Sequence, residues 1–174
     1  MPAAEGTPAW KFGTHLHGCS VFVTRDPELR DMIEYGHVAN RPLGLLEPTC
    51  VQLKDGRIVM LMRAEYGGRL WRADSTDNGR TWTEAWETDI PNPSALSCLI
   101  RLPDGRIALF HNPVGQKGAC GPRSPLSIWI SDDEMGSWAD KQDLVATRDN
   151  PRPAGWAPGL DVLAYPCALL VDGQ

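Results

Sequence analysis

The 174-residue sequence lacks long hydrophobic runs and any excess of basic residues, and each absence excludes a class of protein. The apolar runs span only a few residues, too few to cross a bilayer. Residues 1–12 contain neither a basic start nor an apolar core of the secretory kind, so we expect a cytoplasmic protein. The net charge of −5, without a charge block, disfavours nucleic-acid binding and a nucleic-acid partner.

Familiar site motifs are also missing. The sequence contains no P-loop, GxGxxG, GxSxG or HExxH, so it does not predict a nucleotide site, a hydrolase triad or a zincin, and we expect no cofactor. Five cysteines form no CxxC pair, and Cys50, Cys98 and Cys167 lie in apolar runs, as small buried residues do. His15 and His17 would share one strand face, which suits a metal, but a lone HxH pair is weak and we expect no metal.

No stretch keeps a helical period beyond two turns, whereas 17 Gly and 15 Pro divide the chain into short apolar runs. Such a pattern is typical of many short strands joined by turns. A hydrophobic content of 42% is enough for a packed core. The sequence therefore predicts an all-β domain.

The chain repeats itself. Residues 51–63 and 100–112 each contain a short strand, an Asp-Gly pair and a second strand, and Asp55 and Asp104 lie 49 residues apart. Asp-Gly supplies the positive φ angles of a tight type I′ hairpin turn, so we expect that turn in both copies. A third copy begins at residues 167–173.

A second element follows each hairpin. Residues 75–82 fit the pattern S-x-D-x-G-x-T-W, and residues 131–138 fit it less well, with Met135 in place of the glycine. The Asp can cap backbone N–H groups, the Gly allows positive φ, and the Trp packs onto the sheet. We expect a structural role for Ser75, Asp77, Gly79, Thr81, Trp82, Ser131, Asp133 and Trp138.

Four-stranded units that recur about every 50 residues are typical of β-propeller blades. The sequence predicts one partial propeller domain over residues 1–174. Within it we expect a worn preceding blade in 1–44, blades at 47–92 and 96–148, and the start of another blade at 161–174.

The S-x-D-x-G-x-T-W turn resembles the Asp-box of sialidases and their relatives. Residues 45–174 are similar to the sialidase-like BNR-repeat family in Glu47-Pro48, Asp55-Gly56-Arg57, Arg63, the Asp-box, Asn92-Pro93 and Arg123-Ser124-Pro125. The resemblance implies a six-bladed propeller with a glycosidase site at its axis, of which this chain would hold about three blades.

Strand direction sorts polar residues between the two edges of each blade. The Asp-Gly turns and the Asp-boxes must share one rim, and the start of the first strand and the end of the second must lie on the opposite rim. Polar side chains beside Gly-rich loops make the opposite rim the candidate site. It collects Glu47, Arg63, Glu65, Tyr66, Arg69, Asn92, Ser94, His111, Asn112, Arg123, Asp161 and Tyr165.

Arginines on this rim could bind a carboxylate. Arg63 and Arg123 are predicted to do so, and the alternative is that they tie neighbouring blades to carboxylates such as Glu47. Asn112 and Tyr66 complete the predicted substrate-binding set.

Glu47, His111 and Tyr165 are the candidate catalytic residues. Alternatively, Glu47 forms a structural corner before Pro48, His111 is a hydrogen-bonded loop histidine, and Tyr165 is a rim aromatic. The resemblance implies three substrate-binding arginines, a Tyr–Glu nucleophile pair and an acid/base Asp. The family's Arg-Ile-Pro is replaced here by Leu46-Glu47-Pro48, and the nucleophile region is expected beyond Gln174.

The functional expectation is a sialidase-like exo-glycosidase that hydrolyses a terminal acidic sugar, with a carbohydrate substrate and no membrane partner. One alternative is a non-catalytic propeller that binds carbohydrate or protein. A weaker one is a lyase or hydrolase for uronic-acid polysaccharides built around His111. A partial propeller leaves strand edges open, so the chain by itself is expected to be inactive and to self-associate.

Overall fold

The computed structural model describes residues 18–24, 26–40, 44–66, 68–115, 122–146 and 163–171. Throughout these ranges the regular elements are β-strands, which confirms the all-β prediction. No helix in this part of the chain has the length and apolarity needed to cross a membrane. The strands are β1 (Gly18–Val23), β2 (Ile33–Ala39), β3 (Leu45–Gln52), β4 (Ile58–Ala64), β5 (Arg69–Ser75), β6 (Trp86–Pro91), β7 (Cys98–Arg101), β8 (Ile107–His111), β9 (Leu126–Ser131) and β10 (Asp140–Val145).

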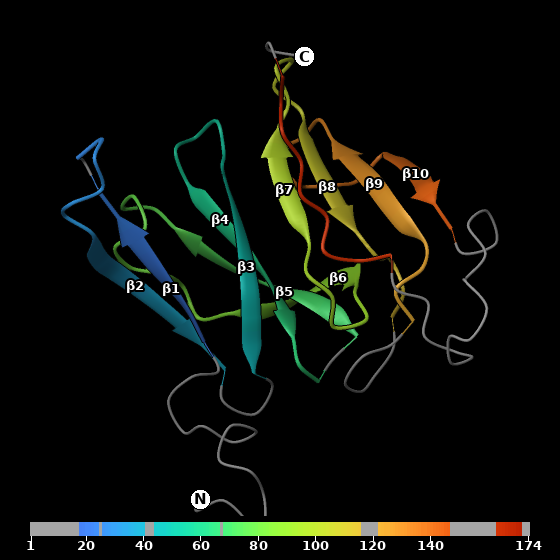
Figure 1. The fold of residues 1–174 in the computed structure, drawn as a ribbon, viewed down its shortest axis with the longest axis horizontal. Coiled ribbons are helices and arrows are strands. Elements are labelled where there is room, and N and C mark those ends of the chain that lie inside the picture. Colours follow the sequence, from blue (N-terminus) through green and yellow to red (C-terminus); the bar gives the residue numbers. More distant parts are fainter. Residues whose placement is uncertain are drawn as a thin grey trace, which may run out of the picture.

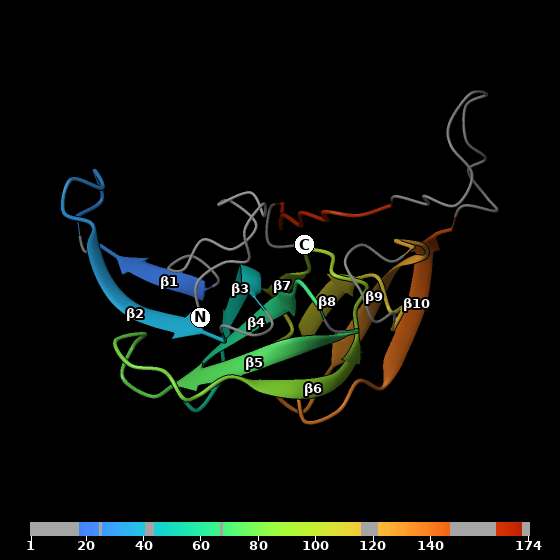
Figure 2. The ribbon, with the colours of Figure 1, turned by 90° about the horizontal axis from the view of Figure 1, so that it is seen from below.

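The strands form three antiparallel sheets that follow one another in chain order (Figure 1). A hairpin of β1 and β2 comes first, then the four-stranded sheets β3–β6 and β7–β10, in which neighbours in sequence are neighbours in space. Both four-stranded sheets contain the repeated order of strands and Asp turns that the sequence predicts. Viewed from below, the sheets are arranged in an arc (Figure 2).

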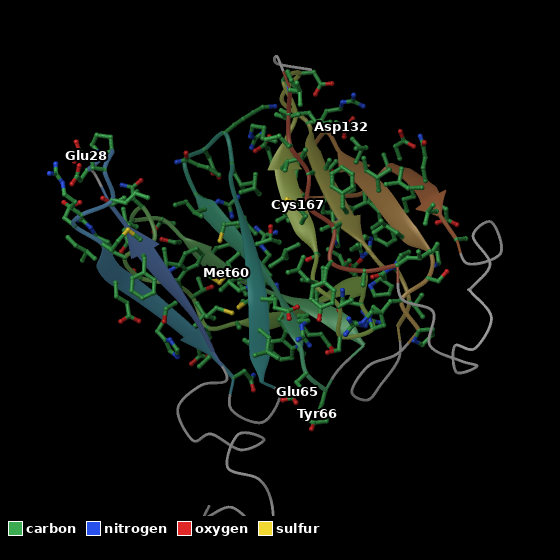
Figure 3. The ribbon with its side chains drawn as sticks, viewed as in Figure 1. Glu28, Met60, Glu65, Tyr66, Asp132 and Cys167 are labelled. Atoms are coloured by element: carbon green, nitrogen blue, oxygen red, sulfur yellow. The ribbon has the colours of Figure 1, made fainter. Side chains whose placement is uncertain are left out.

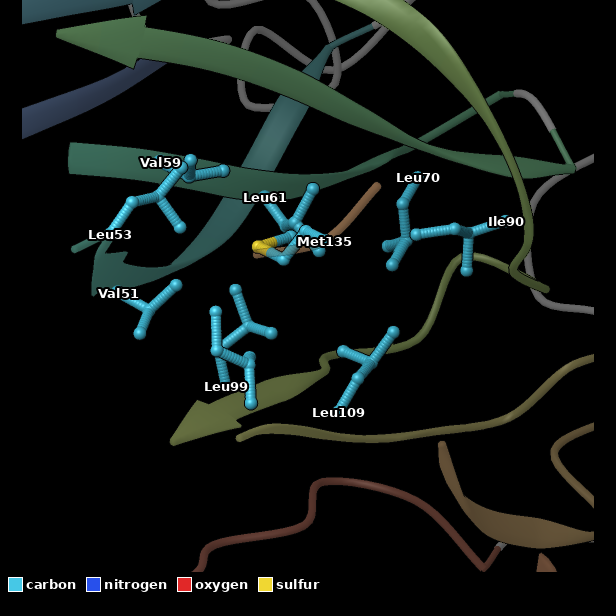
Figure 4. Close-up of a cluster of buried hydrophobic side chains, with 10 residues drawn as sticks. Val51, Leu53, Val59, Leu61, Leu70, Ile90, Leu99, Leu109 and Met135 are labelled. Carbon is cyan, nitrogen blue, oxygen red and sulfur yellow. The ribbon is translucent and has the colours of Figure 1, made fainter. Parts of the chain in front are cut away.

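Strand β4 is buried on both faces, and its alternate residues point to opposite sides. Val59 and Leu61 face the third sheet and join a core with Leu99, Ile107 and Leu109 (Figure 4). The intervening residues Met60 and Met62 join a second core, which also contains Val38 and Leu45. The apolar run of this strand therefore holds all three sheets together.

The Asp-Gly hairpins differ from the predicted turn type. Gly56 has φ of 90° and Gly105 has φ of 89°, but Asp55 and Asp104 are not left-handed, so the type I′ prediction is wrong. The Gly56 N–H donates to the Leu53 carbonyl, and the Leu53 N–H donates to the Arg57 carbonyl. This pattern is a three-residue loop, a type I turn with a following left-handed glycine. The Asp55 carboxylate instead accepts the Arg57 N–H at 3.0 Å.

Both Asp-box turns close in the same way. Asp77 accepts the Thr81 N–H at 2.9 Å and its hydroxyl at 2.6 Å, and Asp133 repeats both bonds with Ser137 at 2.8 and 2.7 Å. Met135 takes the left-handed conformation of the first copy's glycine, with φ of 69°. Its side chain is buried in the core between the second and third sheets, which offsets the strain.

The first Asp-box tryptophan also packs between sheets. A Cβ built on Gly36 in β2 would lie 2.5 Å from Nε1 of Trp82, so the indole rests directly on the backbone of the preceding sheet. The same indole donates from Nε1 to the Gly79 carbonyl at 3.0 Å. The motif therefore fixes both its own turn and the contact with β2.

Residues 163–171 extend in front of β7 in Figure 1, and the Leu163 N–H donates to the Arg123 carbonyl at 2.9 Å. They do not form the first strand of the blade predicted to start at 161–174, because none of the described residues supplies a ladder partner. A further blade in this region stays a prediction.

Candidate functional site

The two rims separate as strand direction requires. In the β4–β5 ladder, Ile58 is opposite Ser75, and Arg63 is opposite Leu70 at the other end. The Asp-Gly turn and the Asp-box therefore share one edge, and Arg63 lies near the opposite edge. Figure 3 shows Asp132, in the second Asp-box, at one edge and Glu65 and Tyr66 at the other.

Glu47 lies in a β-bulge at the candidate rim. The β3–β4 register shifts between Leu46 and Thr49, so that Glu47 and Pro48 together oppose Met62. The φ of Glu47 is 49°, a rare value for a residue that precedes proline. Bulges change the direction of side chains, and this one directs the Glu47 carboxylate at the end of β4.

Arg63 receives that carboxylate in a two-pronged ion pair. Its Nε lies 2.6 Å from Oε2 of Glu47 and its Nη2 lies 2.8 Å from Oε1. Its Nη1 donates to the Ser94 Oγ at 2.7 Å and reaches the Ser94 carbonyl at 3.4 Å. Arg63 therefore joins a carboxylate of its own sheet to the loop that leads to the next sheet.

Ser94 is presented by a short turn after β6. The Asn92 side chain closes this turn by accepting the Ala95 N–H and donating to the Ala95 carbonyl, both at 2.9 Å. Ser94 itself is buried and left-handed, with φ of 58°. The sequence placed Ser94 on this rim but did not single it out. The Asn-Pro-Ser turn was the available signal.

Arg123 approaches the same turn from the segment before β9. Its Nη2 donates to the Ser94 carbonyl at 2.9 Å, and its guanidinium carbon lies 5.1 Å from the centre of the Tyr165 ring. Asn112 holds the loop behind it, because its Nδ2 lies within hydrogen-bond distance of the carbonyls of Arg123, Pro125 and Leu163.

The structure thus brings together Glu47, Arg63, Arg123 and Tyr165, with Ser94 between the arginines. Asn112 lies below them with its side chain fully buried. Tyr66 is on the same rim and 47% exposed. Asp161, His15 and His17 lie outside the described residues.

His111 lies apart from this cluster, inside the third sheet. It is fully buried, and its ring meets Trp129 edge-on at a centroid distance of 4.5 Å. Burial lowers the pKa of His111 to about 4. The Pro91 carbonyl opposes the shift, although no ring nitrogen makes a hydrogen bond of normal geometry with the described residues. His111 is therefore neutral at pH 7.

The cluster directs two sets of guanidinium donors at one acceptor. The guanidinium groups of Arg63 and Arg123 converge on Ser94, and the Glu47 carboxylate binds the first of them. The Ser94 carbonyl oxygen accepts from both arginines, so it occupies the place that an anionic oxygen would take. Within the described ranges, no group of His, Cys, Asp and Glu is arranged to bind a metal.

Solved structures with the same fold include two sialidases. The chain is 17% identical to Hadza microbial sialidase Hz136, with a TM-score of 0.58 over 72% of this chain and 24% of that one. It is 19% identical to the NanB sialidase of Streptococcus pneumoniae, with a TM-score of 0.56 over 73% of this chain and 20% of that one. A protein of unknown function from Dyadobacter fermentans is also 19% identical, with a TM-score of 0.55 over 72% of this chain and 33% of that one.

These likenesses show a shared β-propeller fold, and the chain spans between a fifth and a third of the length of those structures. A search of curated proteins by sequence found no relative. The profile of the BNR repeat-like domain matches residues 10–171, nearly the whole chain. With its two Asp-box turns and its repeated four-stranded sheets, this chain belongs to the BNR repeat-like domain family.

Proposed function

We propose that this chain forms part of a sialidase-like exo-glycosidase and that its Arg63–Ser94–Arg123 cluster binds the carboxylate of a terminal acidic sugar. The observation that carries the proposal is the shared acceptor: guanidinium groups from β4 and from the segment before β9 both reach the Ser94 carbonyl oxygen. A substrate carboxylate could take up the same donors with a full negative charge, and charged hydrogen bonds are the stronger ones.

Each residue has a role in this proposal. Arg123 contacts the carboxylate, and Arg63 adds positive charge while Glu47 positions its guanidinium through both carboxylate oxygens. The Tyr165 ring, stacked on Arg123, borders the sugar. Cleavage would pass through an oxocarbenium-like transition state. Catalytic roles for Glu47, Tyr165 and His111 stay predictions, and the full burial of His111 does not favour one for it.

Two matched ligands test the carboxylate site. We expect N-acetylneuraminic acid to bind the 174-residue chain more tightly than its methyl ester, which has the same ring but no charge. Isothermal titration calorimetry of both ligands measures the difference. Equal affinities would refute the carboxylate site. A fluorogenic sialoside assay on a chain extended to the full propeller tests hydrolysis separately.

A non-catalytic carbohydrate-binding propeller is the second candidate. It is favoured by the pairing of Glu47, because both oxygens of its carboxylate are bound to Arg63 and neither is turned toward proton transfer. Binding of N-acetylneuraminic acid together with no turnover in the extended chain would support this second function.

A further inference from the structure

A groove runs along the flank of the molecule between the second and third sheets, away from the rim cluster. It has a volume of about 750 Å³ and is lined by residues of β6, β9 and β10 and by the second Asp-box turn. Figure 2 shows β6 on the side of the sheets opposite the segment 163–171. Both walls belong to strands described here, so the groove does not depend on any further blade.

Three indole rings line this groove: Trp86, Trp129 and Trp138. Trp86 is 41% exposed, and Trp129 and Trp138 are half-buried against the core between the two sheets. Lys141 places its Nζ 3.9 Å from the centre of the Trp129 ring. The groove is therefore the open outer end of a packed interface, in which Lys141 covers Trp129, Arg72 lies 5.5 Å from the centre of the Trp86 ring, and Trp86 is the most exposed indole.

The polar side chains of the groove suit a neutral ligand. Glu87 and Asp89 on β6 offer acceptors and Lys141 on β10 offers a donor. The Arg72 charge is balanced by Asp74, which it binds at 2.6 and 2.8 Å. With Arg72 balanced, two carboxylates face one ammonium group, so an acidic ligand would be repelled.

A ligand with apolar faces and many hydroxyl groups fits this combination. A pyranose ring presents C–H groups on its faces, which pack on indole rings, and hydroxyls at its edge, which bond carboxylates and ammonium groups. The volume lies within the range of sites that bury small ligands. We propose that this groove binds a neutral oligosaccharide, with a sugar ring stacked on Trp86 and hydroxyls bonded to Glu87, Asp89 and Lys141. This site is independent of the rim cluster and of the function proposed for it.

Calorimetry with lactose, cellotetraose and maltotetraose tests the groove. We expect at least one of these sugars to bind the 174-residue chain, and Trp86→Ala to weaken that binding by about tenfold or more, since tenfold is about 1.4 kcal/mol. Trp86 is exposed, so the variant should keep its fold, which circular dichroism checks. Glu87→Gln provides a second variant that leaves the aromatic surface intact and should also weaken binding.

Phe22→Ala is the matched control, because Phe22 is an aromatic residue of similar exposure, 55%, on the distant strand β1. It should leave sugar binding unchanged. The proposal is overturned if no sugar of the panel gives a saturable signal up to about 10 mM, a very weak affinity. It is also overturned if Trp86→Ala binds as tightly as the parent chain, or if tetramethylammonium binds the groove while the sugars do not.

Discussion

At the residue scale, Ser94 organises the candidate site more than any charged residue does. Its left-handed backbone turns the carbonyl toward Arg63 and Arg123, and its hydroxyl accepts from Arg63 as well. A conformation that costs about 1–3 kcal/mol persists only where its surroundings enforce it, and here the Asn92 side chain closes the turn. The strain therefore marks a position whose geometry is imposed.

The first prediction concerns Arg123. Arg123→Ala should weaken binding of N-acetylneuraminic acid by about 1.5–3 kcal/mol, the value of a charged hydrogen bond, and leave the methyl ester nearly unaffected. Arg69→Ala is the control, since Arg69 is an exposed arginine on the same rim that bonds the Thr88 carbonyl. Calorimetry of both ligands measures the effect. Equal losses for acid and ester would make Arg123 a structural tie.

The second prediction concerns His111 and pH. Its folded pKa, about 4, is below the ordinary value of 6.5 because the ring is buried. Between these values the unfolded chain binds a proton that the folded chain does not, so stability is full above pH 6.5 and falls as the pH drops toward 4. The full loss is on the order of 3 kcal/mol, since one pKa unit corresponds to about 1.4 kcal/mol.

Urea unfolding at pH 7.5 and 5.0 measures this dependence. His111→Gln should flatten it between those two values, whatever its effect on the stability at pH 7.5. His37→Gln changes an exposed histidine and should leave the slope unaltered. A slope retained in His111→Gln would show that another group titrates.

At the scale of single elements, the Asp-box is a turn that joins neighbouring sheets. Its aspartate bonds hydroxyl and N–H groups of its own turn, and the Thr81 bonds chiefly lower the pKa of Asp77 to about 2. A depressed carboxyl pKa adds stability above its ordinary value of 3.8, which is lost as the pH falls toward 2. The motif therefore supports folding and contributes no side chain to the rim cluster.

The third prediction follows from that separation. Asp77→Ala and Trp82→Ala should both lower the free energy of unfolding, Trp82→Ala by about 3 kcal/mol, the low end of the range for tryptophan because its ring is only half-buried. Neither should change the affinity of the folded protein for N-acetylneuraminic acid. Thr76→Ala, an exposed change in the same turn, serves as the control for stability. Lost affinity in a folded variant would contradict the assignment of the two rims.

The fourth prediction tests the contact between Trp82 and β2. An alanine at position 36 would collide with the indole and with the Gly79 carbonyl 2.9 Å away, so Gly36→Ala should cost about 1–3 kcal/mol. At Gly56 a Cβ would meet open space, but φ is 90°, so Gly56→Ala should cost about 1 kcal/mol. Chemical denaturation compares the two variants with the parent chain. A Gly36→Ala variant as stable as the parent would mean that the first hairpin does not pack on the second sheet.

At the scale of the whole molecule, the first hairpin and the segment 163–171 keep apolar surface exposed. Phe22, Met32 and Ile33 on or beside the first hairpin are each more than half exposed, as are Leu169 and Val171. Large exposed apolar surface is typical of surfaces that associate. Within the described residues, the outer edge of β2 pairs with no strand.

The fifth prediction is that the 174-residue chain self-associates. Analytical ultracentrifugation at several concentrations should show species larger than a monomer, and Phe22→Glu together with Ile33→Lys should shift the population toward the monomer. Glu84→Lys, a charge change at an exposed position outside these surfaces, controls for altered net charge. A chain that is monomeric at every concentration would refute the prediction.

Much of the fold could be predicted from the sequence because its signals are local. The Asp-Gly pairs, the Asp-box and the alternating apolar runs act within a few residues, so strands and rims follow from them. The turn type was missed because the hydrogen bond from Gly56 to Leu53, rather than the Asp-Gly pair alone, decides the loop length. Met135 in place of glycine made the second copy a poorer match to the Asp-box pattern. In the structure, the burial of the Met135 side chain compensates for its left-handed backbone.

The all-β class, the repeated unit and the rim on which Glu47, Arg63, Arg123 and Tyr165 lie follow from local sequence patterns. What those residues contact follows from the tertiary structure, because the partners lie on other strands and loops, far apart along the chain. A bulge directs Glu47 toward Arg63, both arginines donate to the Ser94 carbonyl, and His111 is buried with its ring edge-on to Trp129. Such contacts join residues some 16 to 31 positions apart, and no local pattern encodes the packing of one sheet against the next.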